Sequence, residues 1–142
     1  GPVKSVFKIW KKFAPSLFTL GPDIYVPYCA DVMDEYAIKG NPLFIPEIRK
    51  DAVTASYSLY AMLGKNAICY SPFGIEDLSL DPSSIEKPPM DVMLALNIDP
   101  SAMDITGSKK MLADAYQLLE NLEPLYLERN GSFEICDSSW RE

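Results

Sequence analysis

Glu47 is the residue whose type and position best suit chemistry. It is the single acid in the apolar run of residues 43–48, and it lies where that run ends. A run of this length is typical of a strand buried on both faces of a parallel sheet. Functional groups collect beyond the C-terminal ends of such strands. We therefore expect Glu47 to be a functional carboxylate, and the alternative is a glutamate at the rim that pairs with Arg49 or water.

Aromatic and polar side chains follow the ends of three expected strands. They are Asp23, Tyr25 and Tyr28 on the first, Glu47 and Arg49 on the second, and Tyr70, Ser71, Phe73, Glu76 and Asp77 on the third. Carboxylates beside aromatic rings suit a carbohydrate ligand, because sugar rings stack on aromatics and their hydroxyls bond to acids. Glycoside hydrolysis needs two carboxyl groups. The alternative is that Tyr25 and Tyr70 are core rings and that Glu76 lies on a solvated loop.

Composition excludes several kinds of site. The chain has no histidine, and its three cysteines lack the CxxC spacing of zinc sites, so we expect neither a metal nor a Ser-His-Asp nucleophile. It has no glycine-rich phosphate loop, so we expect no nucleotide cofactor. A net charge of −7 gives no footprint for nucleic acid. No run of 18 apolar residues is present, so we expect no membrane span.

Hydrophobic spacing predicts an alternation of helices and strands. An amphipathic helix over residues 3–13 should end before Pro15. Strands are expected over residues 20–26, 43–48 and 67–71, with one helix in each gap, and parallel neighbours need such crossovers. The proline-rich stretch over residues 72–107 is expected to be a long connection with one or two helical turns. Asp51 is expected to cap the helix after the second strand, and Ser108 to cap a long helix after residue 107. The tail over residues 132–142 holds an expected short strand at residues 133–136.

Four segments resemble a known family of enzymes. Residues 7–16 and 21–25 are similar to the sixth-strand region of bacterial β-galactosidase-like glycoside hydrolases, near glycoside hydrolase families 35 and 42. Residues 40–47 and 70–75 extend the similarity through the seventh and eighth strands. The resemblance implies strands six to eight of a partial (β/α)8 TIM barrel over residues 1–131, with a long loop and a C-terminal helix. Residues 132–142 would be a tail or the start of a following domain.

The same resemblance implies roles for individual residues. Glu47 matches the nucleophile of these retaining enzymes, and Tyr25 matches a tyrosine that bonds to it. The acid/base glutamate of the family follows an asparagine, and this chain has no Asn-Glu pair. Substrate-binding residues would be Tyr25, Tyr70, Arg49, Phe73 and Glu76, acting on a terminal sugar without a cofactor. The partner would be the rest of the barrel or a second copy of the chain, in a periplasmic or extracellular location.

Two other functions fit the same residues. One is a non-catalytic carbohydrate-binding fragment, in which the aromatic rings bind sugar and no bond is cleaved. The other is a small flavodoxin-like domain for signalling or interaction, which would have helices on both faces of an open sheet.

Overall fold

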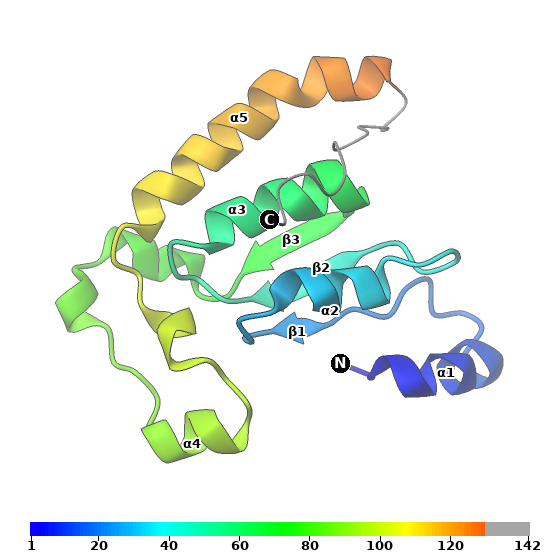
Figure 1. Ribbon diagram of the computed structural model, residues 1–142, viewed down its shortest axis with the longest axis horizontal. Helices are drawn as coiled ribbons and strands as arrows, with labels where there is room; N and C mark the ends of the chain where they lie inside the picture. Colours follow the sequence, from blue (N-terminus) through cyan, green and yellow to red (C-terminus); the bar gives the residue numbers. More distant parts are fainter. Residues whose placement is uncertain (130–142) are drawn as a thin grey trace, which may run out of the picture.

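The computed structural model describes residues 1–129, and its centre is a three-stranded parallel sheet. The strands are β1 (Asp23–Ile24), β2 (Phe44–Ile48) and β3 (Cys69–Pro72), in the spatial order β1-β2-β3 (Figure 1). Asp23 pairs with Glu47, and Phe44 pairs with Cys69. The register shifts between Ile45 and Ile48, which is a β-bulge on β2. The parallel order agrees with the strand-helix rhythm of the sequence.

Helices connect the strands and flank them in the chain. The α-helices are α1 (Phe7–Phe13), α2 (Cys29–Tyr36), α3 (Thr54–Leu59), α4 (Met90–Ala95) and α5 (Ser108–Glu128). The shorter turns are η1 (Lys4–Val6), η3 (Ile75–Ser79), η4 (Pro82–Ser84) and η5 (Pro100–Met103), and α3 continues as the π-helical turn η2 (Tyr60–Gly64). Pro124 lies inside α5 without ending it.

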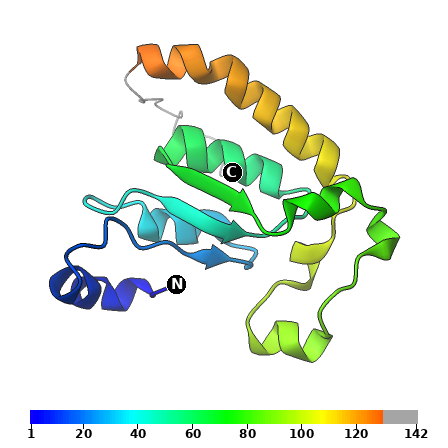
Figure 2. The same cartoon turned by 180° about the vertical axis from the view of Figure 1, so that it is seen from behind.

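One face of the sheet carries the hydrophobic core. Ile24, Ile45 and Ile48 pack with Met33 of α2 and Ala61 of η2, and all five are almost completely buried. α2 and α3 therefore lie on the same side of the sheet, and α5 packs outside α3 (Figures 1 and 2).

The other face of the sheet follows from the register. Since Ile24 pairs with Ile48 on the core face, the neighbouring pair Asp23 and Glu47 points to the opposite face. Figure 2 views the sheet from this side, and no helix of residues 1–129 crosses in front of the strands there. We call it the open face. Phe44 is 36% exposed on it, and Glu47 is partly exposed.

The expected partial TIM barrel is wrong. Residues 1–129 form a small α/β domain with an open three-stranded sheet and five α-helices, and not strands six to eight of a barrel. A barrel wall needs strands long enough to stagger and close, whereas β1 has only two residues. The expected strand over residues 20–26 is short because Pro22 and Pro27 flank it and have no N–H to donate. The amide of Leu20 bonds instead to the buried side chain of Asn41, at 2.8 Å.

Segment 73–107 leaves the sheet beyond its C-terminal edge and returns to it. It contains η3, η4, α4 and η5 and no strand (Figure 1). On its return, the amide of Asp99 donates to the carbonyl of Tyr25, at 2.7 Å, and the amide of Lys50 donates to the carbonyl of Ala102, at 3.0 Å. This segment therefore forms a wall beside the ends of β1 and β2.

Candidate functional site

Glu47 and Tyr25 meet at the C-terminal edge of the open face. The hydroxyl of Tyr25 donates to Oε1 of Glu47 at 2.5 Å. The two side chains come from adjacent strand ends, because Asp23 and Ile24 of β1 pair with Glu47 and Ile48 of β2. Burial raises the pKa of Tyr25 above its ordinary value, and the contact with the Glu47 carboxylate and the charge of Asp23 raise it further. Tyr25 is therefore a protonated donor that fixes the Glu47 carboxylate at neutral pH.

An aromatic edge borders this pair. The ring of Phe73 packs edge-on against Tyr25 with the ring centroids 6.4 Å apart, and Phe73 is 52% exposed. Its amide bonds to the carbonyl of Ile48 at 2.9 Å, which fixes the chain just after β3 beside β2. The exposed ring can stack on an apolar ligand surface.

Ala102 and Met103 of η5 pack together with Tyr25 in a second, small hydrophobic cluster. Tyr25 is only 9% exposed as a result. The position of the Tyr25 hydroxyl therefore depends on a segment almost 80 residues further along the chain.

The other residues expected to bind substrate lie elsewhere. Tyr70 lies on the core face, where its hydroxyl is 2.7 Å from both Oγ1 and the carbonyl of Thr54. Burial raises the pKa of Tyr70. Glu76 lies on η3 and lines a cavity of about 370 Å³ against α5, together with Leu112 and Tyr116. The structure thus brings Tyr25 to Glu47 and Phe73 to Tyr25, and it places Tyr70 and Glu76 in other contacts.

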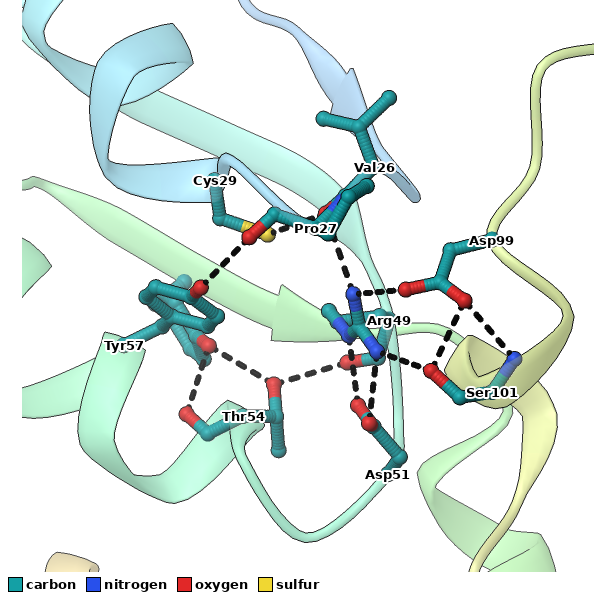
Figure 3. Close-up of polar contacts among 10 residues, drawn as sticks. Val26, Pro27, Cys29, Arg49, Asp51, Thr54, Tyr57, Asp99 and Ser101 are labelled. Atoms are coloured by element: carbon teal, nitrogen blue, oxygen red, sulfur yellow. Dashed lines mark hydrogen bonds and ion pairs between the residues drawn. The ribbon is translucent and has the colours of Figure 1, made fainter.

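Arg49 is buried and bonded to protein groups. Its side chain is 3% exposed and contacts the carboxylates of Asp51 and Asp99 (Figure 3). The sequence also allowed an ion pair between Arg49 and Glu47 at the rim of the site. The structure instead pairs Arg49 with Asp51 and Asp99.

Three residues in this region were not indicated by the sequence. Asp99 and Ser101 bond to Arg49, and the buried Lys50 pairs with Asp77, which is partly exposed. The motif Asp-Pro-Ser at 81–83 and at 99–101 predicts capped turns, and in both the aspartate side chain accepts a bond from the serine amide. That motif cannot indicate that Asp99 lies beside Arg49, because the two are 50 residues apart.

Comparison with known proteins gives no family. No model of a known protein family matches the chain, and no curated protein matches it. Within residues 1–129, no helix is both long enough and apolar enough to span a bilayer. In the same range, no three acidic, cysteine or histidine side chains cluster in a way that could hold a metal ion.

Proposed function

We propose that Glu47 is the nucleophile of a retaining glycoside hydrolase site, β-galactosidase-like in its choice of a terminal sugar. The observation that carries the proposal is the bond from Tyr25 to Glu47, at a strand-end edge on the open face of the sheet. The resemblance of residues 40–47 and 21–25 to β-galactosidase-like enzymes supports the same two roles.

The reaction is a double displacement. An oxygen of Glu47 attacks the anomeric carbon, the bond to the leaving oxygen breaks, and a glycosyl ester of Glu47 forms. A second carboxyl group, ionised after the first step, takes a proton from water as the water attacks the same carbon and the ester bond breaks. This restores the Glu47 carboxylate and releases the sugar with its original anomeric configuration. Tyr25 holds the carboxylate in one orientation through its hydroxyl, and Phe73 offers a ring to the apolar face of the sugar.

Half of the catalytic pair comes from elsewhere in this proposal. The leaving oxygen of an ordinary glycoside needs a proton from a second carboxyl group, about 5 Å from the nucleophile in retaining enzymes. The resemblance assigns that group to a glutamate after an asparagine, which this sequence lacks. A second polypeptide segment packed on the open face supplies that group, because a second copy of this chain would lack the Asn-Glu pair as well. We therefore expect the 142-residue chain alone not to turn over an aryl galactoside.

An activated fluorosugar tests the nucleophile without the missing acid. Dinitrophenolate leaves without protonation, and fluorine at C2 slows hydrolysis of the ester, so a dinitrophenyl 2-deoxy-2-fluoro-β-galactoside should trap Glu47. Peptide mass spectrometry should find one fluorosugar on Glu47, and none after Glu47→Gln. The matched control is Glu76→Gln, since Glu76 lines a cavity against α5 and its loss should leave labelling unchanged. Labelling that persists in Glu47→Gln would refute the proposal.

A non-catalytic carbohydrate site is the second candidate. The exposed ring of Phe73 beside Tyr25 favours it, because stacking alone can hold a sugar. In that case galactose would shift the NMR signals of Phe73 and Tyr25, and the fluorosugar would form no adduct.

A further inference from the structure

The side chain of Arg49 uses all of its hydrogen-bond donors within the protein. Its Nε donates to Oδ1 of Asp51 and its Nη2 donates to Oδ2 of Asp51, both at 2.7 Å. Its Nη1 donates to the carbonyl of Val26 at 3.1 Å and to Oδ2 of Asp99 at 2.9 Å, and Nη2 also donates to Oγ of Ser101 at 2.8 Å. An arginine has five N–H donors, so none is left for a ligand. Figure 3 shows these contacts converging on the guanidinium.

These contacts join three parts of the chain. Asp51 follows the end of β2, Val26 follows β1, and Asp99 and Ser101 belong to the beginning of η5. The carboxylate of Asp99 also accepts bonds from the amide and hydroxyl of Ser101, at 3.0 and 2.9 Å. Arg49 therefore ties η5 to the C-terminal ends of the two strands that carry Tyr25 and Glu47.

The tie has a consequence for Tyr25. The backbone of Asp99 is bonded to that of Tyr25, and Ala102 and Met103 of η5 cover the Tyr25 ring. If η5 moves away, the ring loses its cover and is free to leave the carboxylate of Glu47.

We propose that Arg49 is a positioning residue, which clamps η5 against Tyr25 and so holds the Tyr25 hydroxyl on Glu47. The clamp is inferred from the contacts described above, and only its role in catalysis rests on the proposed function. Arg49 thus acts through Asp99, Ser101 and Tyr25 and touches no sugar.

The titration of Tyr25 reports the clamp directly. Burial and the Glu47 carboxylate both hold the pKa of Tyr25 above its ordinary value. A released η5 would admit water to the ring, which favours the phenolate and lowers that pKa. The readout is the pH titration of Tyr25 in protein labelled with ¹³C-tyrosine, with the signal assigned from its absence in Tyr25→Phe.

Asp99→Ala is the main variant and Asp77→Ala is its matched control. Asp77 pairs with buried Lys50 and ties η3 instead of η5. We expect the Tyr25 phenolate signal to appear at a pH at least about one unit lower in Asp99→Ala than in the parent chain, and no lower than in the parent chain in Asp77→Ala. Ser101→Ala removes one contact of Arg49 and should give a smaller fall, so it serves if Asp99→Ala does not fold. An unchanged Tyr25 pKa in both Asp99→Ala and Ser101→Ala, or an equal fall in Asp77→Ala, would overturn the clamp.

Fluorosugar labelling separates the clamp from the proposed function. With both correct, the rate of Glu47 labelling falls about tenfold in Asp99→Ala, as for loss of one positioning contact, and is unchanged in Asp77→Ala. If the parent chain takes no label but the Tyr25 pKa falls only in Asp99→Ala and Ser101→Ala, the clamp stands and the glycosidase proposal fails. Equal labelling in the parent chain and in a folded Asp99→Ala, with Tyr25 unmoved, contradicts the clamp alone.

Discussion

Tyr25 and Glu47 lie on adjacent parallel strand ends, and the hydroxyl of one donates to the carboxylate of the other at 2.5 Å. The contact links the ring packed under η5 to the acid on the open face. The pH titration of Tyr25 therefore reports whether the Glu47 carboxylate lies beside its hydroxyl.

Glu47→Gln should lower the pKa of Tyr25. Burial raises this pKa, and the hydrogen bond and negative charge of Glu47 raise it further, so a neutral amide removes two of the causes. The remaining burial keeps the value above that of a free tyrosine. The measurement is the ¹³C titration of Tyr25. Glu76→Gln is the control and should not change it, and a Tyr25 pKa that stays the same in Glu47→Gln would mean that the hydrogen bond does not form in solution.

Arg49→Met should destabilise the fold strongly. Removing one partner of a buried ion pair leaves uncompensated carboxylates and typically costs about 3–5 kcal/mol. Urea unfolding with linear extrapolation gives the change in the free energy of unfolding. The matched control is Lys65→Met, because Lys65 pairs with Asp34 at 2.8 Å in a much more exposed site and should lose at most about 1 kcal/mol. If the free energy of unfolding falls equally in the two variants, burial does not make the ion pairs of Arg49 more stabilising than an exposed pair.

Asp99 should make the fold sensitive to acid. Partial burial alone would raise its pKa, but the Ser101 amide and hydroxyl and the Arg49 guanidinium donate to it, and the net pKa is lowered. A carboxylate with a lowered folded pKa stabilises the protein above its unfolded pKa of about 3.9. That contribution is lost as the pH falls through the folded value. Asp99→Asn should therefore show a weaker loss of stability between about pH 5 and pH 2 than the parent chain, in urea titrations at each pH.

Ser108→Ala should stabilise the fold. The hydroxyl of Ser108 is buried at the start of α5 and has no hydrogen-bond partner among residues 1–129. Its removal should gain about 1 kcal/mol, because an unsatisfied polar group is taken out of the interior. Ser58→Ala is the control with the opposite sign, since the buried Ser58 hydroxyl donates to the carbonyl of Ala55 at 2.7 Å. A loss of thermal stability in Ser108→Ala would show that its hydroxyl has a partner in solution.

The N-terminal region should drive self-association. Phe13 and Phe18 are 75% and 70% exposed, and residues 1–22 contain four lysines and no acid in a chain of net charge −7. Exposed apolar residues together with opposite charge elsewhere favour contact between copies. Light scattering should find species above 15.9 kDa that dissociate in the double variant Phe13→Ser, Phe18→Ser. Leu96→Ser, at an equally exposed site after α4, should not dissociate them, and a monomeric parent chain would contradict the prediction.

Local patterns predicted the elements that depend on near neighbours. The helix that ends before Pro15 and the long helix from Ser108 follow from spacing and are confirmed by α1 and α5. The apolar run over residues 43–48 predicted β2, with Glu47 near its end, because a run of this length is typical of a buried strand. The exposed fraction of Glu47 and its neighbours on the open face did not follow from that run.

Caps were predicted less well than elements. Asp51 was expected to cap α3, but its carboxylate binds Arg49, a stronger partner than a backbone amide. Ser108 was expected to cap α5, but Gly107 occupies that position with a φ of 75°, and the Ser108 hydroxyl is unsatisfied within the described residues. The strand expected over residues 133–136 lies outside the described residues. Asp51 took a partner that spacing cannot rank, and Ser108 found no partner among the described residues.

The sequence by itself determined three parallel strands joined by helices, and an acid where the second strand ends. Periodicity and proline positions carry that information, because helices and strands form between residues a few positions apart. Only the tertiary structure decided that the sheet stays open, that η5 packs on Tyr25, and that Asp99 rather than Glu47 pairs with Arg49. The last of these contacts joins residues 50 positions apart. These outcomes depend on how the whole chain packs, which no local pattern encodes.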